Sequence, residues 1–155
     1  MKVILSSRPR VRGRTGFERA SGLVESLASR VAPADALVEI DLVGERRMAE
    51  LNRAYRKRRG ASEILTFPYT SGPGGRAAGE DAVGEIILCW ARLEAGARRR
   101  RVEAAHYMLR LIAHGLCHLK GHRHDSEESE SRMEEVERKL LRGLIPKEAI
   151  ARLFE

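Results

Sequence analysis

The stretch VEAAHYMLRLIAHGLCHLKGHRH, from Val102 to His124, decides the fold that we predict for this chain. From Val102 to Leu119 its apolar residues recur at alternating three- and four-residue steps, the pattern of one face of an α-helix. On a wheel of about 100° per residue, His114 and His118 lie about 160° from the centre of that face. Their neighbours are also largely apolar. We therefore expect a central helix that is packed on both sides.

The spacing of the histidines in this stretch indicates a metal site. His114 and His118 are four residues apart, so a helix projects both from one face. Gly121 can end the helix in a left-handed turn, which would bring His124 back to the same point. Three imidazoles without a fourth protein ligand are typical of a catalytic zinc ion with an open position. A lone histidine is more often a core or surface residue, but this spacing predicts one Zn²⁺ per chain.

Length and composition set the general class of the protein. The 155 residues are enough for one domain with a substantial core, so we expect a single domain over residues 1–155. No apolar run has the length of a membrane span, and the first residues lack a signal region, which predicts a protein without a membrane partner. Cys89 and Cys117 give no disulfide framework, which fits a reducing cytoplasm.

The formal net charge of +7 is unevenly distributed. Basic residues cluster in the segments 8–14, 53–59 and 98–101, whereas acidic residues concentrate between Asp125 and Glu137. Basic clusters attract polyanions through phosphate contacts and counterion release. A generally arginine-rich, solvated surface would give the same charge, so charge alone does not decide between these interpretations.

The remaining patterns favour an α+β fold. Strand-like runs precede residue 90, and only helical patterns follow it. We predict a small, about four-stranded sheet, with strands of mixed direction, packed against helices that include the central metal-binding helix. The predicted strands are 2–6, 37–43, 63–69 and 83–89, and the other predicted helices are 17–31, 44–55 and 127–142.

Three motifs, in chain order, resemble those of the YbeY family, single-strand-specific endoribonucleases of bacterial ribosomal RNA maturation. Residues 114–125, HGLCHLKGHRHD, are similar to the family signature H-G-x-L-H-L-x-G-Y-D-H. Residues 51–56 (LNRAYR) and 62–68 (SEILTFP) are similar to L-N-x-x-Y-R and T-D-V-L-S-F-P, and residues 83–88 (VGEIIL) are similar to L-G-D-I-x-I. The resemblance implies that the metal ligands are His114, His118 and His124.

The chain departs from the family pattern near these ligands. The family's Tyr-Asp before the third histidine is His122-Arg123 here, and two other aspartate positions are Glu63 and Glu85. Asp125 can replace the lost aspartate as a hydrogen-bond acceptor. His122 is an alternative ligand, ranked second because it is so close to the reversal at Gly121.

The resemblance also implies a role for one arginine. Arg56 matches the family's functionally important arginine, and a guanidinium can clamp a phosphate and stabilise charge that develops on it. Its neighbours Arg53, Arg58 and Arg59 are the RNA-binding residues that we expect. The acidic stretch after Asp125 should then face away from the substrate, because it would repel RNA.

The function implied is a zinc-dependent endoribonuclease that cleaves single-stranded RNA in 16S ribosomal RNA maturation and ribosome quality control. Its partners would be ribosomal RNA and the small ribosomal subunit, in the cytoplasm. Two alternatives remain open from the residues. One is a metallohydrolase of peptides or small molecules, although Gly115 stands where metallopeptidases carry their glutamate base. The other is a non-catalytic ribosome-binding factor stabilised by zinc.

Overall fold

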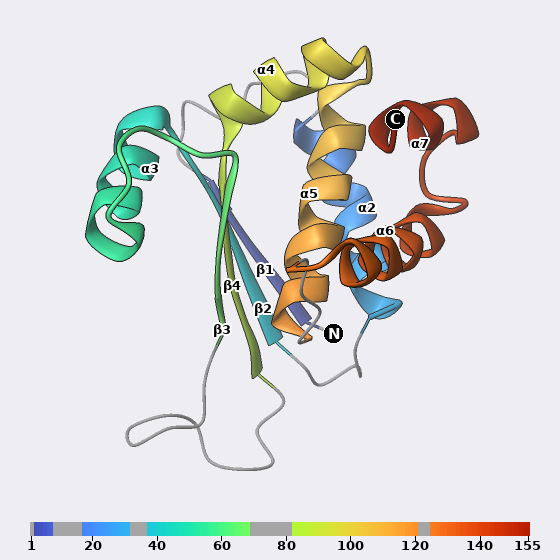
Figure 1. Cartoon of the computed structure of the whole chain (residues 1–155), viewed down its shortest axis with the longest axis horizontal. Coiled ribbons are helices and arrows are strands. Elements are labelled where there is room, and N and C mark those ends of the chain that lie inside the picture. The colour runs from blue at the N-terminus through green and yellow to red at the C-terminus, as the bar shows by residue number, and fades with distance from the viewer. Residues whose placement is uncertain (1, 8–16, 32–36, 69–81, 121–124) are drawn as a thin grey trace.

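The computed structural model describes residues 2–7, 17–31, 37–68, 82–120 and 125–155. Within these residues, the strands form a four-stranded sheet in the order β1-β2-β4-β3 (Figure 1). Strands β1, β2 and β4 are parallel, and β3 pairs antiparallel with β4 at one edge. The mixed sheet confirms the predicted α+β fold. The strands are β1 (Lys2–Ser7), β2 (Leu37–Val43), β3 (Ile64–Pro68) and β4 (Ala82–Cys89).

Helices cover this sheet unequally. The helices are α2 (Phe17–Ser29), α3 (Glu45–Leu51), η1 (Asn52–Arg56), α4 (Trp90–Arg100), α5 (Ala104–Leu119), α6 (Glu127–Leu141) and α7 (Lys147–Leu153). Figure 1 shows α5 and α2 beside one face of the sheet, with α6 and α7 farther out, and α3 on the opposite side. The helix predicted over residues 44–55 is two elements, because η1 continues α3 as one turn of π-helix. Helices α4 and α7 were not predicted.

Helix α5 is the centre of the molecule, as its sequence pattern predicted. It contacts α2, α4, α6, α7, β3 and β4. Side chains on opposite sides of it, such as Leu109 and Leu111, are both buried. No helix in the described ranges is long and apolar enough to cross a membrane.

The two faces of the sheet contribute to different clusters of apolar side chains. In β2, Val38, Ile40 and Leu42 are buried and belong to the large core under α2 and α5, whereas Val43 joins a smaller cluster with Met48 of α3. This follows from the alternation of side chains along a strand. The histidine-bearing helix therefore packs on the larger core, while α3 and η1 are attached to the other face.

Candidate active site

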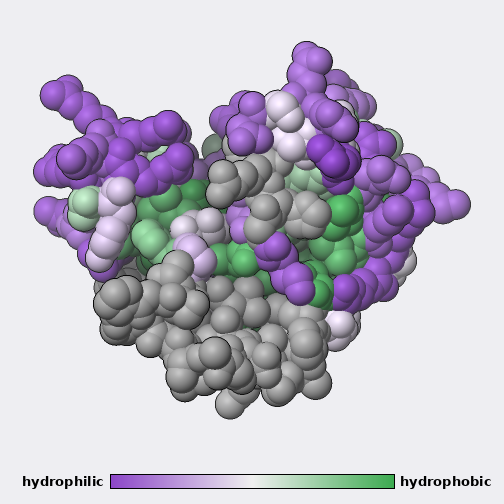
Figure 2. All heavy atoms as spheres, turned by 60° about the horizontal axis from the view of Figure 1, so that its bottom comes forward, coloured by the Kyte–Doolittle hydropathy of each residue, from purple (hydrophilic) through white to green (hydrophobic). Residues whose placement is uncertain are grey.

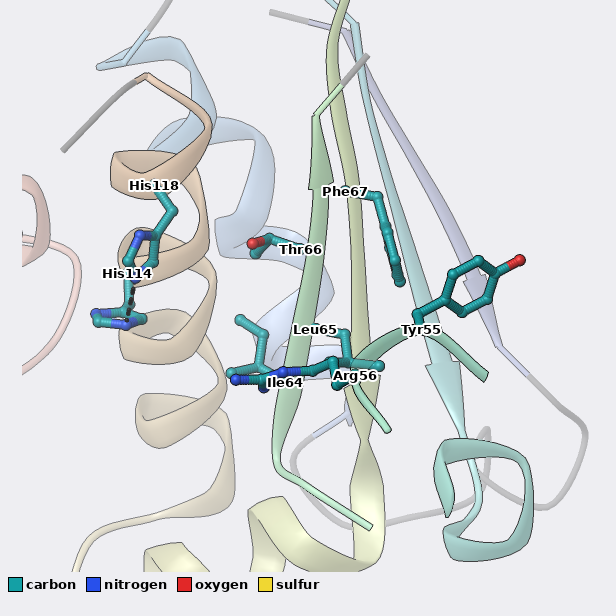
Figure 3. A pocket seen from close by; sticks show the side chains of 8 residues that line it. All are labelled: Tyr55, Arg56, Ile64, Leu65, Thr66, Phe67, His114 and His118. Carbon is teal, nitrogen blue, oxygen red and sulfur yellow. Dashed lines mark hydrogen bonds between the residues drawn. The ribbon is translucent and has the colours of Figure 1, made fainter. Parts of the chain in front are cut away.

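A cavity of about 440 Å³ lies between helix α5 and the edge strand β3. Figure 3 shows the two histidines on one side of this cavity and β3 on the other. In Figure 2 apolar residues line the hollow between two hydrophilic lobes. The cavity thus joins the segments LNRAYR and SEILTFP with the histidine motif, whereas residues 83–88 do not line it. Its lining residues are Tyr55, Arg56, Ile64, Leu65, Thr66, Phe67, His114 and His118.

His114 and His118 face each other across one turn of α5. Their Nε2 atoms are 3.1 Å apart, and their rings are nearly perpendicular, at 83°. Zinc at about 2.0–2.1 Å from tetrahedral nitrogen ligands holds them about 3.3 Å apart. The two Nε2 atoms therefore fit adjacent positions on one metal ion.

The rest of the predicted ligand set lies outside the described residues. This applies to His124 and to the alternative ligand His122, and Arg123 also lies outside the described residues. Among the residues that are described, no group of three His, Cys, Asp or Glu side chains is arranged to hold a metal. The metal site at His114, His118 and His124 therefore stays a prediction, of which the described chain contains two ligands.

A carboxylate of helix α6 contacts His114 from outside the cavity that Arg56 lines. Oε1 of Glu137 is 2.6 Å from Nδ1 of His114, and the Glu137 side chain is only 1% exposed. Glu137 and His114 share a separate, smaller cavity with Arg110 and Met133. The acidic stretch after Asp125 was expected to face away from the substrate. Glu137 does not line the main cavity, but it is buried against a predicted metal ligand. The apolar stripe of α6, with Met133, Leu140 and Leu141 buried, turns residue 137 inward as well.

Asp125, the acceptor expected near the third histidine, lies just before α6. Its side chain accepts a hydrogen bond from Ser129 at 3.2 Å. Ser126 and Ser129 form a capping box that starts the helix at this point. In the described part of the structure, the carboxylate that contacts a histidine ligand is therefore Glu137.

The side chain of Asn52 anchors η1, which contains most of the motif LNRAYR, to the loop before β3. Asn52 is 2% exposed, and its Nδ2 donates to the Gly60 carbonyl at 3.1 Å and to Ser62 Oγ at 3.0 Å. These bonds close the loop between η1 and β3, and Lys57 (φ 53°) ends η1 in a left-handed conformation. The closed loop holds Arg56 beside β3, where its guanidinium reaches toward α5 (Figure 3).

Tyr55 and the other arginines of this segment lie at the rim. The Tyr55 ring packs edge-on against Phe67, with centroids 5.2 Å apart, and remains 67% exposed. Arg53, Arg58 and Arg59 are exposed and do not line the cavity. The structure therefore brings Arg56 together with the histidine pair and leaves Arg53, Arg58 and Arg59 on the adjoining surface.

Gly115 explains why no glutamate follows the first histidine. A Cβ atom at this position would lie 3.0 Å from Ile86 Cδ1 and 3.1 Å from Thr66 Cγ2. Gly115 therefore faces the sheet, in close contact with side chains of β3 and β4. A glutamate at this position would have to displace these side chains, which disfavours the metallopeptidase arrangement.

Neither of the two glutamates at family aspartate positions lines the cavity. Glu63, just before β3, accepts a hydrogen bond from the buried Tyr107 at 2.7 Å and lies 3.6 Å from Arg99. Glu85 is paired with Glu39 in the sheet, on the face turned away from α5. Burial raises the pKa of Glu85, and the nearby charges of Glu39 and Asp41 add to this.

Cys117, the residue before His118, is a core residue. It is 2% exposed in the main apolar cluster. Burial raises the pKa of its thiol to about 12, with a further contribution from Glu137. The neutral thiol is therefore the stable form at physiological pH.

Comparisons with known proteins agree with the motifs. Residues 17–145 match the family model described as "Endoribonuclease YbeY". A protein of that name from Thermodesulfovibrio yellowstonii is 34% identical over 115 residues, which cover 74% of this chain and 70% of the relative. Another from Anaeromyxobacter sp. is 32% identical over 143 residues, which cover 92% and 72% of the two chains.

A solved structure supports the fold. The solution structure of TM1509 from Thermotoga maritima has a TM-score of 0.58 to this chain and covers 90% of it and 89% of the solved chain. The two sequences are 23% identical, so this likeness concerns the architecture of sheet and helices.

Proposed function

The chain belongs to the YbeY family of endoribonucleases, and from this we propose that it is a zinc-dependent enzyme that cleaves single-stranded RNA. The observation that carries the proposal is the meeting of His114, His118 and Arg56 at one cavity. The three side chains come from two motifs about 60 residues apart. Metal-assisted cleavage of a phosphodiester needs the metal ligands and a phosphate-binding group at the same place, and this cavity brings them together. We assign the third ligand to His124.

The protein's own groups have separate tasks in this proposal. A zinc ion bound at the histidines would supply a Lewis acid and lower the pKa of bound water. Arg56 would hold the scissile phosphate and stabilise the charge that develops on its oxygens. Ile64, Leu65 and Phe67 of β3 would present apolar side chains to the substrate on one side of the cavity. The nucleophile is either water or the RNA 2′-hydroxyl, and a 2′,3′-cyclic phosphate on the product would identify the hydroxyl.

The flanking RNA would lie over the basic segment beside the cavity. Arg53, Arg58 and Arg59 are exposed and flank Arg56 in the chain, so phosphates next to the scissile one would meet their guanidinium groups. We further propose that the biological substrate is ribosomal RNA, in 16S maturation and quality control on the small ribosomal subunit, and that the enzyme acts in the cytoplasm. These finer assignments rest on the family resemblance.

The central test is RNA cleavage by purified, zinc-loaded protein. Labelled single-stranded RNA should be cut, and His114→Ala should reduce the rate by about 100-fold or more because a metal ligand is lost. His106→Ala is the matched control, since His106 lies on the same helix, pairs with Glu103 and does not line the cavity. Binding of RNA without cleavage by the wild type would contradict the enzymatic proposal, and cleavage of casein instead would favour a peptidase.

The assignment of the arginines has its own test. Arg56→Ala should lower the cleavage rate by about 10²–10³-fold with a smaller effect on affinity. Reversal of Arg53, Arg58 and Arg59 to glutamate should instead weaken RNA binding and flatten its salt dependence, by about one unit of slope for each lost phosphate contact. An unchanged affinity and slope in the triple variant would place the RNA elsewhere on the protein.

The metal is tested without RNA. Metal analysis after gentle purification should give about one zinc per chain, although nickel can replace zinc at imidazole ligands. His124→Ala should lose the metal. Full retention in that variant would assign the third position to His122 instead.

A further inference from the structure

Glu137 is a carboxylate in a position where the helix otherwise presents apolar side chains. Its neighbours on the buried stripe of α6 are Met133, Leu140 and Leu141, and Glu137 itself is 1% exposed. A buried carboxylate is stable only when other groups compensate for its lost hydration. The contacts of its two carboxylate oxygens therefore indicate the role of this residue.

The two oxygens of Glu137 have different surroundings. Oε1 contacts Nδ1 of His114 at 2.6 Å, the distance of a strong hydrogen bond. Oε2 lies 3.8 Å from Nη2 of Arg110, an ion pair that is too long for a hydrogen bond, and has no hydrogen-bond partner among the described residues. The shorter of the two contacts is thus with the histidine, and Arg110 supplies a compensating charge.

Arg110 is itself held by the C-terminal helix. It donates to the carbonyl oxygen of Leu153, and its guanidinium lies 4.3 Å from the centre of the Phe154 ring. These contacts hold the guanidinium beside Glu137. The side-chain contacts thus form a chain from Phe154 through Arg110 and Glu137 to His114.

Glu137 is not placed to be a ligand itself. It approaches Nδ1 of His114, whereas Nε2 of the same ring faces His118 in the main cavity. The small cavity that Glu137 lines and the main cavity share only His114 in their linings. The imidazole ring therefore separates the carboxylate from the proposed metal position.

We propose that Glu137 is a positioning residue for the metal site. An ionised carboxylate accepts a hydrogen bond, so Nδ1 of His114 must carry the hydrogen and Nε2 keeps its lone pair. Glu137 thereby fixes both the tautomer and the direction of the ring before a metal arrives. This inference rests on the proposed metal-dependent function for its purpose, but the effect on the tautomer is a property of the metal-free protein.

The first experiment measures that tautomer directly. Long-range ¹H–¹⁵N NMR of metal-free protein should show His114 as the Nδ1–H form in the wild type. In Glu137→Ala the Nδ1–H preference should be lost, and in Glu137→Gln, whose amide oxygen can still accept, it should be largely kept. An unchanged His114 spectrum in Glu137→Ala would overturn the proposal, whatever the activity of the variant.

The second experiment measures zinc affinity by competition with a chromophoric chelator. Loss of such an outer contact weakens metal binding by about 10–100-fold, so we expect this change for Glu137→Ala and a smaller one for Glu137→Gln. Glu134→Ala is the control, because it removes one negative charge from the same helix near the same small cavity. Equal weakening by Glu134→Ala would mean that only general charge matters, and affinity of Glu137→Ala within twofold of wild type would refute the role.

The two proposals fail in different ways. If even the wild type binds no zinc, the proposed metal-dependent function is wrong, yet the NMR result still decides whether Glu137 sets the tautomer of His114. Circular dichroism of each variant checks that the fold is kept. Should Glu137→Ala not fold, Glu137→Gln measured against Glu134→Gln provides the same comparison with uncharged isosteres, and equal zinc affinities of these two would refute the role.

Discussion

Replacing Asn52 by alanine should destabilise the protein by about 2 kcal/mol. The side chain is buried, and it makes two hydrogen bonds, to the Gly60 carbonyl and to Ser62 Oγ. At about 1 kcal/mol each, their loss gives this magnitude. No further penalty for a stranded buried group is expected, because Gly60 is exposed and Ser62 keeps its bond to the Ile64 carbonyl at 3.2 Å.

Urea denaturation followed by circular dichroism measures this change as a shift of the midpoint at constant slope. For a chain of this length, the corresponding fall in Tm is about 4–8 °C. Ser62→Ala removes one of the two bonds and should cost about 1 kcal/mol, and the double variant should fall short of the sum because the bond is shared. A change below about 0.5 kcal/mol for Asn52→Ala would refute the claim that this residue closes the loop that follows Arg56.

Three other variants or treatments test the surroundings of the site. Tyr107→Phe removes the hydrogen bond to Glu63, which is partly open to solvent, and should lower the free energy of unfolding in urea by about 1–2 kcal/mol; a stability equal to wild type would show that the bond contributes nothing. Gly115→Ala should change the free energy of unfolding by no more than about 1 kcal/mol, since the better helix propensity of alanine offsets its tight contacts. Gly115→Glu should cost several kcal/mol because it buries a carboxylate. Comparable urea midpoints for the two variants would contradict the close packing at this position. Burial raises the thiol pKa of Cys89 and Cys117, so thiolate is scarce at pH 8 and neither should react with iodoacetamide until urea unfolds the chain; rapid alkylation of the native protein, detected by mass spectrometry, would show that the thiols are accessible.

The sequence predicted those elements whose burial follows a simple period. Strand β2 was predicted with its observed bounds, Leu37–Val43, because its side chains alternate between two different environments. Helix α5 was predicted because both of its sides are packed, and only its first turn begins later than expected, at Ala104. The π-turn of η1 was not predicted, since the shift from i+4 to i+5 bonding leaves no mark in composition.

The helix α4 was missed although a signal was present. Its buried residues Trp90, Leu93 and Ala97 recur at helical steps. Charged residues fill the rest of the segment and mask this pattern, and the basic cluster at its end also fits an RNA-binding surface. Glu137 was likewise grouped with the solvent-exposed acidic residues of its segment, although it is buried. Its place on the stripe with Met133 and Leu140 was the available signal.

The candidate site was predictable where it is local in sequence. The four-residue spacing of His114 and His118 predicted their approach, which the 3.1 Å separation of their Nε2 atoms confirms. The contacts of His114 with Glu137 and of Tyr107 with Glu63 join residues 23 and 44 positions apart. Such pairs depend on how helices and strands dock, and a single sequence does not specify that docking.

The central place of α5 has a consequence for how this protein would tolerate change. The helix that carries the histidine pair is also the one on which α2, α4, α6, α7 and the sheet pack, so the site has no independent support. A substitution that loosens the packing of this helix far from the cavity would therefore also disturb the position of the histidine pair relative to Arg56. Variation compatible with a working site is most restricted at the residues that touch this helix.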